Sequence, residues 1–328
     1  MLNILRTMRN PDWYHGFNKK RDFFEGWYFK LIATEGKGSC VIIPGIALGK
    51  DDSENHSFIQ IYESDTGAFE YITYPVSDFI AHKNEFYISI GESMFSLTGI
   101  ALNIDGSVFN IKGRLDFRNQ IKWPDSIFSP GSMGYYNYMP MMQCYSQVCA
   151  LDMMINGSLS VNGRNVQYKN DRGYIEKNWG RAFPFGWVWF QCNHFTESPV
   201  SLSASIGHIP FITGSFRGFL IGFLVKERFY AFTTLNKSSL SINKTGKSIF
   251  LETENKTHIL TVKVDAENAA FVNLKGPKDG RMVPLVDETI QGIVEARLID
   301  KQNGNVVVSD RGIYAGVEFG GEQMLVAQ

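Results

Sequence analysis

The stretch from Tyr174 to Phe195, YIEKNWGRAFPFGWVWFQCNHF, decides how the rest of this chain is interpreted. It holds three of the six tryptophans of the 328-residue sequence and places them close to carboxyl and amide side chains. A β-strand points successive side chains to opposite faces, so the second half of the stretch divides into two sets. One set is Trp187, Trp189, Gln191, Asn193 and Phe195, and the other is Val188, Phe190, Cys192 and His194.

Both faces of this predicted strand carry large apolar groups, whereas a half-buried strand usually has one polar face. We therefore expect both faces to lie out of water. Buried amides require hydrogen-bonding partners, so Gln191 and Asn193 need a reason to be there. Two explanations remain open: a ligand cavity, or a hydrogen-bond network buried between two packed sheets.

The composition is that of a folded, soluble protein rich in β-strands. Hydrophobic residues make up 44% and aromatic residues 14% of the chain, and aromatic residues favour strands and apolar cavities. The 32 basic and 33 acidic residues nearly cancel, so no global field favours nucleic acid. The only compact basic cluster, Lys19 to Arg21, is too short to change this conclusion.

The sequence predicts neither a metal site nor a cofactor. The four cysteines, Cys40, Cys144, Cys149 and Cys192, form no CxxC pair and have no histidine at ligand spacing. No glycine-rich phosphate loop, nucleophile elbow or HExxH motif occurs. The N-terminal region lacks a signal-peptide core, and no apolar run reaches the roughly 18 residues of a spanning helix. We expect a cytoplasmic protein with reduced thiols.

Outside the central stretch, the pattern is one of short strands separated by turn signals about every 8–12 residues, which is typical of sandwiches and barrels. No helical apolar stripe persists, and residues 1–22 are expected to be an irregular lead-in broken by Pro11 and Gly16. Asn156-Gly157 and Asn162-Gly163 are predicted hairpin turns. The prediction is an all-β chain with two antiparallel barrel-like domains, residues 1–170 and 171–328.

Two further segments carry candidate functional residues. In the predicted strand that begins FFEGWYFK at residue 23, Glu25 shares its face with Phe23 and Trp27, which is unfavourable for an unpaired carboxylate. Glu25 is either a functional acid or is tied to backbone amides or to Arg21. The tyrosine- and methionine-rich segment 123–145 either covers an apolar pocket or plugs a domain interface, and its aromatic side chains could touch a membrane surface.

The motifs FFEGWYFK (residues 23–30) and EKNWG (residues 176–180), with the continuation through Trp187 to Asn193, resemble the tocopherol cyclase family. This family belongs to a lipocalin-like superfamily that includes carotenoid hydratases. The resemblance implies two lipocalin-like barrel domains with an apolar pocket. The sequence departs from the plant cyclases in lacking their transit peptide and longer N-terminal half. It also carries Tyr145-Ser146 where they have a His-Trp pair.

The resemblance implies cofactor-free acid catalysis, in which a protonated carboxyl adds a proton to a prenyl alkene and aromatic faces stabilise the cation. Ring closure by a phenol gives a chromanol, whereas addition of water, the reaction of the hydratases, gives an alcohol. Glu176 matches the acidic position of the superfamily, with Glu25 as the competing acid. The remaining predicted site residues are Tyr174 and Asn178 around the carboxyl, Trp27, Trp187 and Trp189 around the cation, Gln191 and Asn193 at the headgroup, and His194.

Two other classes of protein stay open. The first is a non-catalytic lipocalin-like binding protein for an apolar quinone, terpenoid or lipid, because barrels of this kind host both binding and catalysis. The second is a structural protein in which Glu176 is locked in an ion pair with Lys177 or Arg181. For His194, the alternative to a general base is a purely structural role. The expected partner is an apolar small molecule, with possible peripheral membrane contact.

Overall fold

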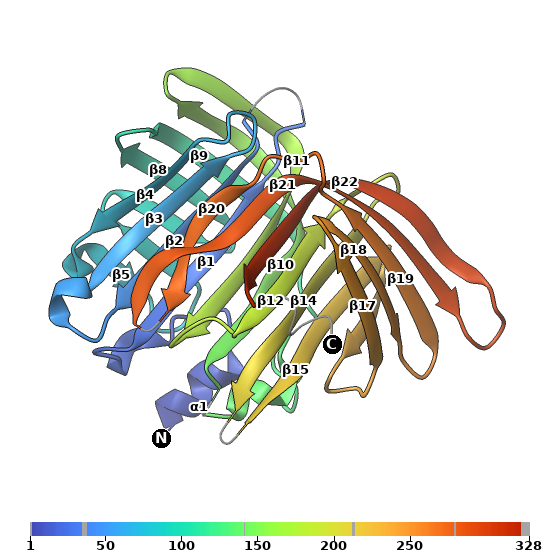
Figure 1. Cartoon of the computed structure of the whole chain (residues 1–328). Coiled ribbons are helices and arrows are strands. Elements are labelled where there is room, and N and C mark those ends of the chain that lie inside the picture. Colours follow the sequence, from blue (N-terminus) through green and yellow to red (C-terminus); the bar gives the residue numbers. More distant parts are fainter. Residues whose placement is uncertain (1, 35–37, 141, 212–213, 279, 323–328) are drawn as a thin grey trace. The chain divides into compact units, whose positions relative to one another are not determined.

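The computed structural model describes residues 2–34, 38–140, 142–211, 214–278 and 280–322, and it confirms an all-β chain with little helix (Figure 1). The chain divides into two compact units. Unit 1 contains residues 1–183 and 274–285, and unit 2 contains residues 184–273 and 286–328. Among the described residues, no helix is long and apolar enough to cross a membrane.

Unit 1 is built on an 11-stranded antiparallel sheet in the order β4-β3-β2-β1-β11-β10-β9-β8-β7-β6-β5, curved into a nearly closed barrel. Its elements are α1 (Leu2–Arg9), η1 (Gly16–Asn18), β1 (Phe23–Leu31), β2 (Cys40–Leu48), η2 (Asp52–Glu54), β3 (His56–Glu63), β4 (Phe69–Tyr74), η3 (Val76–Asp78), β5 (Phe79–Ala81), β6 (Tyr87–Ile90), β7 (Ser93–Ser96), β8 (Gly99–Asp105), β9 (Asn110–Ile121), η4 (Gly134–Tyr138), β10 (Cys144–Val161) and β11 (Arg164–Gly180).

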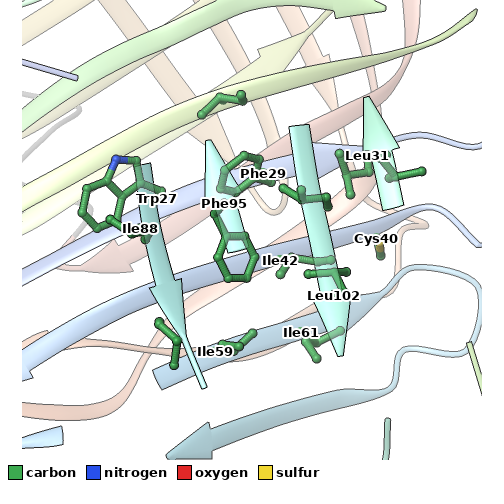
Figure 2. Close-up of a cluster of buried hydrophobic side chains, with 14 of the residues drawn as sticks. Trp27, Phe29, Leu31, Cys40, Ile42, Ile59, Ile61, Ile88, Phe95 and Leu102 are labelled. Carbon is green, nitrogen blue, oxygen red and sulfur yellow. The ribbon is translucent and has the colours of Figure 1, made fainter. Parts of the chain in front are cut away.

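Side chains fill the interior of this barrel-like sheet. Alternate residues of β1, including Trp27 and Phe29, are fully buried in one hydrophobic cluster with residues of β6 to β8 such as Phe95 and Leu102 (Figure 2). Burial of large apolar side chains is the main favourable contribution to folding. The period of two in FFEGWYFK therefore identifies the face of β1 that points into the core.

Unit 2 is built on the second sheet, whose main path is β16-β15-β14-β12-β22-β21-β19-β18-β17, with β13 and β20 paired to β22 and β21. Val188, Phe190 and Cys192 lie in its hydrophobic core. The strands of this second sheet are β12 (Gly186–Cys192), β13 (His194–Phe195), β14 (Val200–Phe211), β15 (Gly214–Val225), β16 (Arg228–Thr233), β17 (Ser239–Thr245), β18 (Ser248–Glu254), β19 (His258–Asp265), β20 (Val272–Lys278), β21 (Arg281–Asp300) and β22 (Val306–Gly321).

The predicted boundary between residues 170 and 171 falls inside β11, which pairs with β1 and β10 along its length. The compact units instead divide between Phe183 and Pro184. Residues 274–285 return to unit 1, where the Gln60 side chain bonds both backbone groups of Lys275. The Gln60 amide donates to the Lys275 carbonyl at 3.0 Å and accepts from its N–H at 2.9 Å.

Three local predictions were wrong. Residues 2–9 form α1, which ends at Arg9, because helical backbone is unfavourable at Asn10, the residue directly before Pro11. Asn156-Gly157 is not a turn: β10 runs through it with a bulge, and Gly157 adopts a positive φ of 133°. Phe195 lies in the core of unit 2 rather than with the tryptophans, because β12 ends at Cys192 and the alternation restarts in β13.

The turn at Asn162-Gly163 is confirmed. Asn162 has φ 50° and Gly163 has φ 78°, both in the left-handed region that a two-residue type I′ hairpin requires. Burial of both faces of the central strand is also confirmed, since every residue from Gly186 to Cys192 is buried.

Candidate functional site

The pairing of β1 with β11 sorts the candidate residues onto two faces of one sheet. Tyr28 lies opposite Glu176, and Trp27 lies opposite Lys177. Because neighbouring residues of a strand point to opposite faces, Glu176 and Lys177 point in opposite directions. Trp27 belongs to the hydrophobic core of unit 1, so Lys177 shares the core side and Glu176 lies on the outer face of the sheet.

Glu176 is buried, with 4% of its surface exposed, and each of its carboxyl oxygens has a hydroxyl partner. The Tyr174 hydroxyl donates to one oxygen at 2.6 Å. The Ser146 hydroxyl of β10 donates to the other at 2.9 Å. Asn178 lies on the same face and is half-buried. A buried carboxyl with two hydroxyl partners is held in one orientation, as a proton donor to a bound substrate must be.

Sequence reasoning did not assign three residues of this outer face. Ser146 reaches Glu176 only because β10 and β11 pair with Ser146 opposite Asn178. Lys30 is fully buried and lies opposite Tyr174, and Tyr28 packs edge-to-face on the Tyr174 ring with centroids 6.5 Å apart. Lys30 could have been found from the sequence, because a lysine within an apolar strand is seldom fully buried without a purpose.

Glu25, the competing acid, lies on the core side of the sheet in an ion pair. Its carboxylate accepts from the Lys177 ammonium at 2.6 Å, and both side chains are fully buried. The backbone N–H of His15 donates to the same carboxylate at 2.9 Å. Of the two explanations left open for Glu25, the paired carboxylate tied to a backbone amide is therefore the one observed, with a lysine in place of Arg21.

His15 completes this group, which we call the His15–Glu25–Lys177 cluster. The His15 Nε2 lies 3.2 Å from the Thr7 carbonyl, which can only accept, so Nε2 carries the hydrogen. Nδ1 then accepts from the Lys177 ammonium at 2.9 Å. Lys177 also donates to the Pro11 carbonyl at 2.9 Å. The cluster thereby fastens the N-terminal segment to β1 and β11.

The charges of the cluster are set by burial and by each other. Burial and the nearby Lys177 ammonium hold the pKa of His15 below its usual value, so the ring is neutral. Burial by itself would raise the pKa of Glu25, but Lys177 and the bonds from His15 outweigh it and lower the pKa. Burial lowers the pKa of Lys177 against the opposing pull of Glu25. Glu25 is thus an ionised structural partner.

The structural role considered for Glu176 was an ion pair with Lys177 or Arg181, and the pair with Lys177 does not form. Lys177 follows Glu176 in sequence but pairs with Glu25 on the opposite face. The other proposed partner, Arg181, is exposed to solvent.

Trp27, predicted to line a cation pocket, stacks on Phe86 with ring centroids 5.5 Å apart and faces away from Glu176.

The predicted residues of unit 2 share a buried face of β12. Trp187, Trp189 and Gln191 alternate with the core residues, and Gln191 is fully buried. The indole N–H of Trp187 donates to the Glu318 carboxylate of β22, and Glu318 lies opposite the fully buried Glu288 of β21. Neither glutamate was singled out from the sequence.

Asn193 and His194 follow this strand. Asn193 is fully buried, and its side-chain oxygen lies 3.1 Å from Nδ1 of the half-buried His194. The His194 ring packs edge-to-face on Tyr314 at 5.5 Å between centroids. The assignment of Trp187, Trp189 and these residues to substrate binding stays a prediction.

In the described ranges of the chain, no group of three histidine, cysteine, aspartate or glutamate side chains is placed to hold a metal ion. All four cysteines are free thiols, and three of them, Cys40, Cys149 and Cys192, are buried. A buried free cysteine packs as a small apolar group.

The fold and this site define an antiparallel β-protein of the lipocalin-like type with a buried, hydroxyl-bonded carboxyl on a sheet face. Residues 105–321 match the family described as tocopherol cyclase-like. This match covers more than half of the chain, and the protein belongs to that family.

Two plant relatives agree with this assignment, and two solved structures share the fold. The chain is 24% identical to the chloroplastic tocopherol cyclase of Zea mays, covering 96% of this chain and 78% of the maize protein. It is 23% identical to the probable chloroplastic tocopherol cyclase of Oryza sativa subsp. japonica, covering 96% and 79%. The fold is shared with kievitone hydratase from Nectria haematococca, at a TM-score of 0.50 and 12% identity over 95% of this chain and 94% of the hydratase. It is also shared with CghA crystallised with Sch210972, at a TM-score of 0.53 and 11% identity over 91% and 88%.

Proposed function

We propose that this protein is a cyclase that closes a prenylated hydroquinone to a chromanol, with Glu176 as the acid. Membership of the tocopherol cyclase-like family supports an enzyme of the cyclase or hydratase type. The observation that carries the finer proposal is the Glu176 carboxyl, which is buried and bonded to Tyr174 and Ser146 at 2.6 and 2.9 Å.

The reaction needs no change of oxidation state. The Glu176 carboxyl adds its proton to the less substituted carbon of a trisubstituted alkene, and the positive charge develops on the tertiary carbon. The phenol oxygen of the same substrate bonds to that carbon and loses its proton, so the product is an isomer of the substrate. Glu176, as carboxylate, recovers a proton and the cycle is complete. Tyr174 and Ser146 are positioning residues, because each bonds the carboxyl rather than the reacting carbon.

The experiment is incubation of the purified protein with a prenylated hydroquinone in D₂O, with product analysis by mass spectrometry. Cyclisation gives a chromanol that carries one solvent deuterium on the carbon next to the new C–O bond. A hydratase also places one solvent deuterium on the protonated carbon, but it gives a tertiary alcohol that has gained one molecule of water. In a parallel incubation in H₂¹⁸O only this alcohol takes up the label, so ¹⁸O separates the two reactions.

Glu176→Gln keeps the shape of the side chain but has no proton to give. We expect turnover to fall by about 100-fold to 10,000-fold, while the affinity for the hydroquinone changes little. The matched control is Glu227→Gln, at an exposed position, which should retain full turnover. Tight binding without conversion by the wild-type protein would assign it to the binding proteins and overturn the proposal.

A further inference from the structure

A tight turn on the surface of unit 1 holds two apolar side chains out in solvent. Ile127 is 69% exposed and Phe128 is 86% exposed, the two largest values among the large apolar side chains of the described residues. Both stand at the centre of the sequence Ser126-Ile127-Phe128-Ser129, which we call the 126–129 tip. Single exposed apolar residues are common, but two adjacent ones at this exposure are unfavourable in water unless something covers them.

Hydrogen bonds fix the backbone of the tip. The Ser126 N–H donates to the Ser129 carbonyl at 3.0 Å, and the Ser129 N–H donates back to the Ser126 carbonyl at 3.1 Å. The Ser129 N–H also lies 3.1 Å from the Ser126 hydroxyl. From η4, the Tyr138 hydroxyl donates to the Ile127 carbonyl at 2.6 Å. The two side chains are thus presented by an ordered turn.

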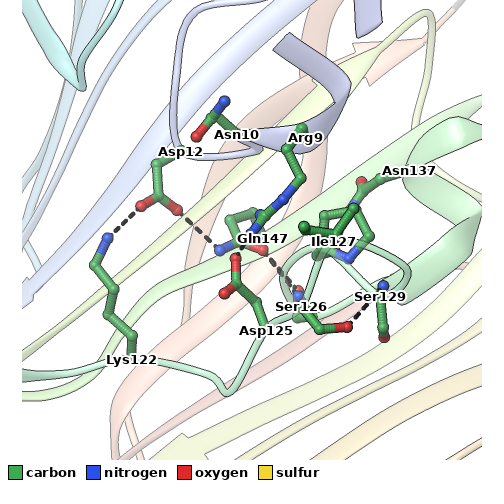
Figure 3. A network of polar contacts seen from close by, with 12 residues as sticks. Arg9, Asn10, Asp12, Lys122, Asp125, Ser126, Ile127, Ser129, Asn137 and Gln147 are labelled. Atoms are coloured by element: carbon green, nitrogen blue, oxygen red, sulfur yellow. Dashed lines mark hydrogen bonds and ion pairs between the residues drawn. The ribbon is translucent and has the colours of Figure 1, made fainter. Parts of the chain in front are cut away.

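The segment that carries the tip is fastened to the N-terminal region and to β10 (Figure 3). Arg9 of α1 pairs with Asp125 at 2.8 Å, directly before the tip. Lys122 pairs with Asp12 at 2.6 Å. Asp12 also accepts from the buried Gln147 amide of β10 at 2.8 Å. These contacts anchor the tip to the sheet that carries Glu176.

The charged groups of α1 and of the segment that carries the tip have an excess of one positive charge. The cations are Arg6, Arg9 and Lys122 and the carboxylates are Asp12 and Asp125; Arg9 and Lys122 are each paired with one of these carboxylates, so Arg6 supplies the excess. This local excess of positive charge contrasts with a net charge of −1 for the whole chain. Serine hydroxyls flank the apolar pair. Apolar side chains beyond a polar, cationic rim match the layered order of a bilayer surface.

We propose that the 126–129 tip inserts Ile127 and Phe128 into a lipid bilayer that contains anionic headgroups. Two side chains that project from a convex turn suit a deformable acyl layer better than a protein surface, which would need a matching hollow. Tyr135 of η4, which is 51% exposed, adds an aromatic side chain of the type that favours the headgroup region. Docking there would give the protein direct access to an apolar substrate dissolved in the membrane.

Co-sedimentation with vesicles tests the proposal without any measurement of turnover. Wild-type protein should sediment with vesicles of phosphatidylcholine and phosphatidylglycerol, and more weakly with phosphatidylcholine alone. The double variant Ile127→Ser/Phe128→Ser should bind the vesicles at least about tenfold more weakly than the wild type, since burial of one such side chain can account for a factor of this size. The control Ile80→Ser/Phe250→Ser changes two side chains that are 59% and 52% exposed and should bind as the wild type does.

A fluorescent variant locates the insertion. Phe128→Trp should shift its emission to shorter wavelength on addition of vesicles and be quenched by spin-labelled lipid, whereas Phe250→Trp should do neither. The proposal is overturned if the wild type sediments with neither vesicle, or if the double serine variant binds as tightly as the wild type. A dimer that is lost in the double variant, without vesicle binding, would assign the tip to a second copy of the chain and would also overturn it.

Discussion

The Glu25–Lys177 ion pair leads to a counterintuitive prediction about stability. Lys177→Met removes the ammonium and leaves the Glu25 carboxylate fully buried with the backbone N–H of His15 as its remaining donor. Breaking a buried pair by removing one partner costs about 3–5 kcal/mol, because the remaining charge is uncompensated. We expect a loss of free energy of unfolding in that range, and more toward its upper end since Lys177 also bonds the Pro11 carbonyl.

A second substitution should restore part of that loss. Glu25→Gln removes the stranded charge while its amide oxygen still accepts from the His15 N–H. The double variant Lys177→Met/Glu25→Gln should therefore be more stable than Lys177→Met alone, with a coupling energy of about 1–3 kcal/mol. Replacing both Glu25 and Lys177 should therefore lower the free energy of unfolding less than replacing Lys177 alone.

The assay is urea unfolding at pH 7 followed by tryptophan fluorescence. The Lys177 ammonium lies 5.1 and 4.5 Å from the ring centroids of Trp27 and Trp179, so the signal reports on this region. The Lys177→Met midpoint should fall by about 1 M or more. As a control, Lys226→Met removes an exposed ion pair with Glu197 at 3.4 Å and should change stability by about 0.5 kcal/mol or less. A loss below about 1 kcal/mol for Lys177→Met, or a double variant no more stable than the single one, would refute the reasoning.

Two further predictions concern acid and the candidate site. Because burial and Lys177 lower the pKa of His15 from 6.5, the unfolded chain takes up its proton first as the pH falls. Stability should therefore decline below about pH 6.5, by at most about 1.4 kcal/mol per pH unit for this group, and Glu25, whose lowered pKa acts in the same direction, should add to the decline below about pH 4.5. Urea midpoints from pH 4 to 8 check this, and a profile that His15→Gln leaves unchanged would contradict it. Tyr174→Phe removes one partner of Glu176, the proposed acid, and should lower kcat about tenfold with little change in KM; an effect on KM alone would argue against a positioning role.

The sequence predicted the parts of the fold that depend on local alternation. The period of two separated Trp187 and Trp189 from the core residues of β12, and positive φ angles at Asn162 and Gly163 follow from their residue types. The prediction from alternation failed where one extra residue interrupts the period of two. After Cys192 the strand breaks, and Phe195 changes face.

The candidate site shows a different limit. The sequence placed Tyr174 beside Glu176, since they are two residues apart on one strand. It marked Ser146 only as a departure from the plant cyclases and did not predict its bond to Glu176, because a strand pairing over 30 residues of separation decides that contact. It also suggested an ion pair between Glu176 and Lys177, which are adjacent in the chain. In a strand, adjacency is the strongest reason against such a pair, since the two side chains leave opposite faces.

This opposition suggests why a buried ion pair lies directly beside the proposed acid. A slip of one residue between β11 and β1 would turn Glu176 into the hydrophobic core and bring Lys177 to the outer face. With the observed register, Lys177 meets Glu25 at 2.6 Å and the carbonyls of the N-terminal segment. In the slipped register both charges would lose their partners, at a cost of several kcal/mol. A buried ion pair that contributes little to the net stability of the fold can thus still select one strand register. The cluster on the core side would thus hold the proposed acid on the outer face of the sheet.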